Sequence, residues 1–249
     1  DFTMVFGYPG RTQEYLTSYA VKMITDVQNP NRINIRQNKI DIIARYMNND
    51  ASVRIQYSAK YAGISNAWKK WIGENRGLKR LNAIEKKEDF EKRIQLWIDS
   101  DATRKLSFGA LLPNYKLMYQ NLSPYQLAYE YYNEAIYSQD IIRLVNSFKK
   151  LTEFTDSTKT NEIKDYVDRL NNALNSHFKD YYLPLDKELF TKMIALYYQN
   201  MDKKFIPAEL RQIDSKYKGN INAYVDNLYS KTIFTNRAKL DDFLKNYKI

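Results

Sequence analysis

Hydrophobic residues recur every three or four positions along most of the chain. The clearest stripe lies on a predicted helix from about Ser52 to Ile72 and consists of Tyr57, Tyr61, Ile64, Trp68 and Trp71. Its spacings of 4, 3, 4 and 3 residues place these side chains on one face of an amphipathic α-helix, which we expect to be buried. Similar stripes predict helices at about 11–28, 33–48, 78–99, 123–154, 161–178, 187–201, 221–229 and 237–247, and a short one that begins after Pro207.

Proline and glycine mark the expected ends of several helices. Pro30 is predicted to end the first helix, and Gly73 and Gly77 to bracket the exit of the third. Ser123 and Pro124 are predicted to start a long helix, as N-cap and first helical residue, after an irregular stretch at 100–113. On the charged helix at 78–99 we expect these side chains to face inward: Leu78, Leu81, Ile84, Phe90, Ile94 and Trp97.

The N-terminus has a different pattern. Residues 2–6 form an apolar run typical of a β-strand, and Pro9-Gly10 is typical of a type II turn. No other segment is a convincing strand that could pair with it. We therefore expect an all-α fold, an irregular multi-helix bundle, with one short N-terminal strand whose sheet lies elsewhere in a longer protein.

Composition excludes several classes of enzyme. The 249 residues contain no cysteine and one histidine, His177, which excludes thiol catalysis, zinc fingers and iron–sulfur clusters. His177 lies at the border of an apolar stripe, where a rim position is the simplest interpretation, and the sequence has no GxSxG motif to supply a nucleophile. We expect no catalytic residue, no metal ligand and no cofactor in this chain.

The charge of the chain is +10, from 39 basic and 29 acidic residues. Acidic residues are interleaved with the basic ones almost everywhere, whereas a nucleic-acid surface usually has a concentrated basic stripe. No apolar run approaches the roughly 18 residues of a membrane helix. We therefore expect neither nucleic-acid binding nor a membrane span.

The helix at 52–72 also has a smooth second face. At 100° per residue, residues Ala59, Ala62, Gly63, Asn66 and Gly73 fall within about 60° of one line. Four of the five carry little or no side chain, so another helix or a ligand could approach closely. Asn66 is the polar group on this face, either bonded to backbone at a helix crossing or directed into a cleft.

Short motifs are spread along the whole chain. They are Gly7-Tyr8-Pro9-Gly10-Arg11-Thr12, Tyr15-Leu16-Thr17-Ser18-Tyr19, Tyr61-Ala62, Ser65-Asn66-Ala67-Trp68-Lys69-Lys70, Ile72-Gly73, Leu185-Asp186-Lys187, Met193, Leu196-Tyr197-Tyr198, Tyr224-Val225-Asp226 and Ser230-Lys231-Thr232-Ile233-Phe234. Together they resemble the dipeptidyl-peptidase seven and eleven family of bacterial serine exopeptidases. The first motif and the Asn-x-Trp-Lys motif at 66–69 are the most specific, although Ala67 stands where the family commonly has an aromatic residue.

The resemblance implies the part this chain plays. In that family a chymotrypsin-like double β-barrel carries the Ser-His-Asp triad, and an inserted helical domain caps the cleft. Residues 1–10 would be the junction from the barrel and 11–249 a single helical cap domain, inactive alone. The family's asparagine that hydrogen-bonds the free N-terminal amine of the peptide substrate corresponds to Asn66.

The resemblance also implies partners and a location. The partners are the substrate N-terminus and the catalytic barrel of the same polypeptide, and the full-length enzyme is open to homodimer formation. The location is the periplasm or cell envelope, after secretion. The alternative from the residues alone is a free-standing basic helical module that binds a protein through its tyrosine-rich surface, or, with weaker support, RNA.

Overall fold

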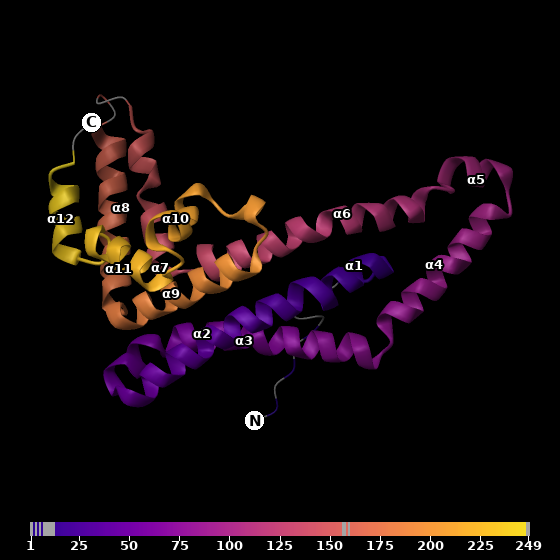
Figure 1. Cartoon of the computed structure of the whole chain (residues 1–249), viewed down its shortest axis with the longest axis horizontal. Helices are drawn as coiled ribbons and strands as arrows, with labels where there is room; N and C mark the ends of the chain where they lie inside the picture. The colour runs from indigo at the N-terminus through magenta and orange to yellow at the C-terminus, as the bar shows by residue number, and fades with distance from the viewer. Residues whose placement is uncertain are drawn as a thin grey trace. The chain divides into compact units, whose positions relative to one another are not determined.

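Helices follow one another along almost all of the described chain (Figure 1). The computed structural model describes residues 2, 4, 6, 13–155, 158 and 160–247. Within these ranges there is no β-strand, and no helix is both long enough and apolar enough to cross a bilayer. The α-helices are α1 (Ser18–Lys22), α2 (Asn29–Asn49), α3 (Ala51–Arg80), α4 (Ala83–Asp99), α5 (Ala102–Phe108), α6 (Leu111–Tyr131), α7 (Asp140–Ser147), α8 (Thr160–Lys179), α9 (Leu183–Asn200), α10 (Ala208–Tyr217), α11 (Ile221–Lys231) and α12 (Arg237–Lys245). Two π-helical turns, η1 (Met23–Gln28) and η2 (Tyr132–Tyr137), and two 3₁₀ turns, η3 (Lys149–Glu153) and η4 (Lys203–Phe205), complete the set.

The all-α prediction is confirmed, whereas the N-terminal strand is not. At the described positions of the predicted strand, Phe2, Met4 and Phe6 have no strand conformation and are exposed. The predicted turn at 7–10 lies outside the described residues. The apolar run at the start of the chain thus has no partner strand among the residues that the structure describes, and its exposed side chains are not part of a core.

The chain divides into two compact units. The first consists of residues 1–30 and 71–127, and the second of 31–70 and 128–249.

In the first unit, α1 packs against α4 through a buried carboxylate. Glu91 accepts hydrogen bonds from the Ser18 amide and the Ser18 hydroxyl, both at 2.6 Å. A carboxylate at a helix N-terminus satisfies amides that have no partner within the helix. The inward face predicted for the helix at 78–99, which contains α4, is partly wrong, because Leu81, Phe90 and Trp97 are exposed while Glu91 is buried.

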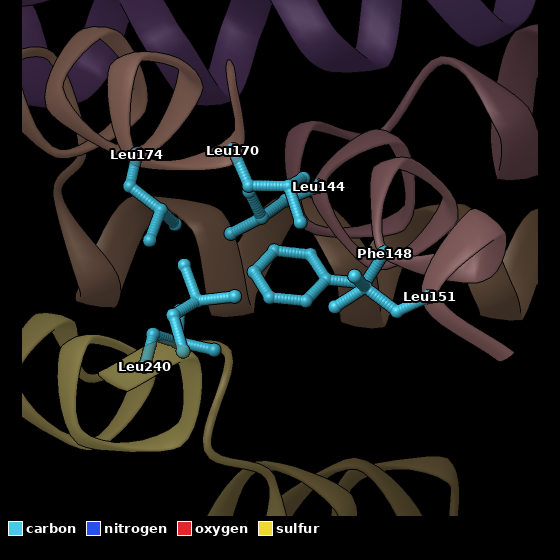
Figure 2. Packing of buried hydrophobic residues seen from close by; sticks show 7 residues of the cluster. Leu144, Phe148, Leu151, Leu170, Leu174 and Leu240 are labelled. Atoms are coloured by element: carbon cyan, nitrogen blue, oxygen red, sulfur yellow. The ribbon is translucent and has the colours of Figure 1, made fainter. Parts of the chain in front are cut away.

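The core of the second unit contains a purely apolar cluster (Figure 2). Leu170 and Leu174 of α8 meet Leu144 of α7, and the ring of Phe148 lies between them and Leu240 of α12. The predicted stripe of the helix at 161–178 is confirmed by this burial. Helix α8 also packs against α7, in the segment before it.

A second cluster holds the predicted stripe of α3. Tyr57 is buried against Val53, Ile43 of α2 and Leu185 of α9, with Tyr61 and Ile64 packed against them. Trp71 is also buried, 9% exposed, within the first unit. The aromatic face predicted at 52–72 is thus a core face, and the opposite face of α3 is free for other contacts.

Pro30 does not end a helix, contrary to the prediction. Helical structure runs without interruption from Ser18 to Asn49, because the chain widens into the π-helical turn η1 just before the proline. The Asn29 amide donates to the carbonyl of Ile24, five residues back. Pro30 has no N–H for the Thr25 carbonyl, which accepts instead from the Asn75 side chain at 3.2 Å. A side chain 50 residues away therefore compensates for the missing donor.

Three further predicted boundaries are wrong. Helix α3 continues through Gly73 and Gly77 to Arg80, and Asn82, in the left-handed conformation, precedes α4. Pro124 lies inside α6, and the stretch predicted as irregular contains α5. At the start of α11, the Asn220 side chain accepts from the Ala223 amide and caps the helix.

Candidate functional site

Asn66 lies on the exposed face of α3, one helical turn after Gly63. Its amide has no hydrogen-bond partner among the described residues. Ala59 and Ala62 are exposed as well, and a Cβ atom added at Gly63 would meet no atom within 4 Å. Within the described part of the chain, the small residues therefore do not form a contact with a crossing helix. The face is open to an external ligand or another chain segment.

Beside this face lies a cavity of about 310 Å³ within the second unit. Gly63 lines it, together with side chains from α2, α3, η2, α7 and α9. The charged and polar members are Arg36, Lys39, Tyr57, Lys60, Glu134, Ser138, Gln139, Asp140, Arg143 and Asp186. Three of them are almost fully buried: Lys39 is 6% exposed, Gln139 4% and Asp186 3%.

The end of the π-helical turn η2 supplies the hydrogen-bond acceptors for Lys39. At its end the Ser138 amide donates to Asn133 and the Gln139 amide to Ile136, so the carbonyls of Glu134 and Ala135 lose their usual α-helical donors. Side chains replace them. Lys39 Nζ donates to the Glu134 carbonyl and to Ser138 Oγ, both at 2.5 Å, and Gln139 Nε2 donates to the Ala135 carbonyl at 2.8 Å.

Burial weakens the charge of Lys39. Desolvation lowers its pKa to about 8, an effect that the nearby Glu134 opposes and Arg36 and Arg143 reinforce. At neutral pH the amine is still mostly protonated. It is held in a rigid position by its two acceptors, one of them a backbone carbonyl.

Two ion pairs stand in the wall of the cavity. Arg36 makes a two-pronged contact with Glu134, with distances of 2.8 and 3.1 Å from its nitrogens to the two carboxylate oxygens. Lys60 Nζ lies 2.7 Å from Asp140 Oδ2. Each pair neutralises its own charges and links helices that are distant in the sequence.

A buried carboxyl lies at the start of α9. Asp186 Oδ2 accepts hydrogen bonds from the hydroxyls of Tyr181 at 3.0 Å and Tyr229 at 2.8 Å. Desolvation raises the pKa of Asp186 to about 6, although both tyrosine hydroxyls oppose the shift. Burial and the adjacent Asp186 charge in turn raise the pKa values of Tyr181 and Tyr229, so both hydroxyls are donors at neutral pH.

His177 is half-buried on α8. Its ring lies 4.8 Å from the ring of Tyr181, and its Nε2 is buried with no hydrogen-bond partner within the described residues. Burial lowers the pKa of His177, so the ring is neutral at pH 7. No group of three or more His, Asp or Glu side chains in the described ranges could hold a metal ion.

The sequence predicted Asn66 but missed the cavity beside it. The signal was available in α2, where Lys39 stands midway between Ile35 and Ile43, at spacings of four, in the middle of a buried stripe. Asp186 similarly stands four residues before Phe190 on the buried face of α9. A charged residue inside an apolar stripe is the pattern that marks such a group.

Comparison with known proteins places the chain in context. A family model described as Peptidase S46 matches residues 1–248. An Asp/Glu-specific dipeptidyl-peptidase of Flavobacterium psychrophilum is 35% identical over 247 residues, which cover 98% of this chain and 33% of that protein. Dipeptidyl-peptidase 7 of Porphyromonas endodontalis is 31% identical over 245 residues, covering 98% and 29%.

Solved structures share the fold. The crystal structure of Porphyromonas endodontalis DPP11 in complex with the dipeptide Arg-Asp matches with a TM-score of 0.76 and 23% identity, over 98% of this chain and 34% of that one. The chain therefore spans about a third of the length of the relatives and structures that it matches.

Proposed function

Because the chain belongs to the peptidase S46 family, we propose that it is the helical cap of a bacterial serine dipeptidyl-peptidase, which releases dipeptides from the N-termini of peptides. Residues 11–249 form the cap domain, and residues 1–10 lead into it from a catalytic double β-barrel. The dipeptidyl-peptidase names of the similar proteins support this function. In this proposal the Ser-His-Asp triad lies on other parts of the same polypeptide, and the chain alone is inactive.

The role of the cap is to bind the substrate's free N-terminus. The observation that carries this assignment is the exposed amide of Asn66, which has no partner in the part of the chain that the structure describes. It lies beside Gly63 and two alanines, on a helix face that leaves room for a peptide backbone. The amide oxygen accepts an N–H from the ammonium group. A charge-assisted hydrogen bond of this kind contributes about 1.5–3 kcal/mol.

This arrangement fixes the distance between the substrate's N-terminus and the peptide bond that is cleaved. The enzyme must recognise an α-ammonium group and place the second peptide bond at the nucleophile. A fixed acceptor on α3 sets one end of that distance, and the body of the cap excludes longer N-terminal extensions. Secretion into the periplasm or cell envelope and assembly as a homodimer complete the proposal for the full-length enzyme.

The test is kinetic and uses the full-length enzyme. Asn66→Ala should lower kcat/KM on dipeptidyl substrates at least about tenfold, because the lost hydrogen bond to the ammonium group is present in the transition state. Asn172→Ala, which truncates an exposed asparagine on α8, is the matched control and should leave kcat/KM unchanged.

A blocked substrate makes this test specific. A substrate with an acetylated N-terminus lacks the ammonium group, so Asn66→Ala should not weaken its turnover further. An unchanged kcat/KM for Asn66→Ala on free substrates would refute the assignment of Asn66.

A further inference from the structure

The cavity beside Gly63 has room for more than a few waters. Its volume of about 310 Å³ corresponds to roughly ten water molecules at ~30 Å³ each. Lys39, Gln139 and Asp186 all line it and are nine-tenths or more buried. All three make hydrogen bonds within the chain, and a side chain that keeps spare donors or acceptors beside such a space can also contact a ligand there.

The charges that line the cavity do not cancel. Arg36 pairs with Glu134, and Lys60 pairs with Asp140. This leaves two cations and one carboxylate: Lys39, Arg143 and Asp186. The Arg143 guanidinium has no carboxylate partner in the described part of the chain, and it lies close enough to Lys39 to affect its pKa.

Each of these three groups has unused hydrogen-bonding capacity. The Lys39 ammonium donates to two acceptors, which leaves one N–H. Asp186 accepts both tyrosine hydroxyls at Oδ2, and within the described residues nothing donates to Oδ1. The two cations can therefore hold a carboxylate, and Asp186 Oδ1 can accept from an ammonium group.

We propose that this cavity is a binding site for a small α-amino-acid zwitterion, a free amino acid or a dipeptide. The ligand's carboxylate binds Arg143 and Lys39, and its ammonium group binds Oδ1 of Asp186. One source of such a ligand, a released dipeptide, rests on the proposed function; a free amino acid does not. The site is separate from Asn66, which does not line the cavity.

Its position gives the site a consequence for substrate binding. Gly63 belongs to the cavity wall and precedes Asn66 by one turn on the same face of α3. A bound zwitterion would thus lie beside the helix that holds the substrate's amine in the proposed enzyme. The concentration of small peptides or amino acids could then affect how the cap binds the substrate's amine.

Calorimetric titration of the full-length enzyme tests the proposal, after treatment with a sulfonyl fluoride that blocks the catalytic serine. The probes are glycine, glycylglycine, N-acetylglycylglycine and glycylglycinamide. We expect glycine or glycylglycine to bind, with the better binder identifying the source. The two capped dipeptides, each lacking one charge, should bind at least about tenfold more weakly, since each lacks one charge-assisted contact.

Variants locate the binding. Arg143→Ala and Asp186→Asn should each weaken the binding of the better probe at least about tenfold. Arg143 is exposed and Asn still accepts from the tyrosine hydroxyls, so both variants should fold. Lys192→Ala removes an exposed cation from α9 and should leave binding unchanged.

Three results would overturn the proposal: no binding of either free zwitterion, equal binding of the capped dipeptides, or binding that is insensitive to both Arg143→Ala and Asp186→Asn. Binding that is lost in Asn66→Ala would assign the ligand to the amine subsite instead and would also overturn it. The kinetic test of Asn66 stands apart, because its failure would refute the amine subsite and leave the titration of the cavity unaffected.

Discussion

The second unit contains two interiors of opposite character. The cluster of α7, α8 and α12 consists of leucines and one phenylalanine with no polar side chain among its buried members. The cavity of α2, α3, η2, α7 and α9 is lined by ten charged or polar side chains. The first interior is full and the second is open, although α7 contributes to both.

This difference separates stability from binding. Close-packed apolar side chains stabilise the fold by removing about 25 cal/mol per Å² of apolar surface from water. Buried charges do the reverse, since desolvation is costly and is recovered only through good partners. Lys39 and Asp186 are buried beside the cavity, where they contribute little to the stability of the fold. Charged side chains in such a position are typical of a binding site.

The largest effect is expected in the apolar cluster. Leu174→Ala should lower the free energy of unfolding by about 2–5 kcal/mol, because Leu174 is 0% exposed and its removal leaves a void. Denaturant unfolding measures it. Leu183→Ala, at a position 43% exposed, is the control, and an equal loss in both variants would contradict the assignment of this cluster as core.

The next effect has the opposite sign and depends on pH. The pKa of Asp186 is raised from 3.8 to about 6 on folding. Its contribution to stability is therefore fully present below about pH 3.8 and is lost as the pH rises through about 6. Asp186→Asn keeps an acceptor without the charge, so its stability relative to the natural protein should be about 2 kcal/mol higher at pH 7 than at pH 4.

Unfolding measured from pH 4 to pH 7 tests this sign. The difference between Asp186→Asn and the natural protein should grow with pH across this range. A difference that stays constant, or a variant that loses stability as the pH rises, would show that the buried carboxyl is stabilised by its tyrosines more than it is penalised by burial.

The smallest effect is expected at the cavity mouth. Arg143→Ala should change the free energy of unfolding by less than about 0.5 kcal/mol, because Arg143 is exposed and has no ion pair among the described residues. Measured beside the titration, it should leave folding intact and weaken ligand binding. A large loss of stability would show that Arg143 stabilises the fold, as the apolar cluster does, and would contradict the contrast drawn between the two interiors.

Patterns that act within one element were predictable from the sequence. The aromatic stripe of α3 predicted a buried face, because the spacing of the side chains along the helix decides it. The small face of α3 was predicted in the same way. Its openness was not, since only the arrangement of other helices determines whether something covers it.

Features that depend on distant partners were not predictable. Pro30 is accommodated by a widened turn and by the side chain of Asn75, and no local rule anticipates a donor 50 residues away. The contact between Lys39 and Ser138 spans 99 residues. The polar cavity is a sum of such contacts, so a pattern within single helices could at most flag Lys39 and Asp186 as charges in apolar stripes.

The open space at Gly63 offers a practical handle on the cap. A Cβ there meets nothing within 4 Å, and glycine inside a helix costs about 1 kcal/mol relative to alanine. Gly63→Cys should therefore be tolerated, and this chain contains no other cysteine. An environment-sensitive fluorophore attached there would lie at the cavity wall and one turn from Asn66, so its emission would report optically on the occupancy of either site.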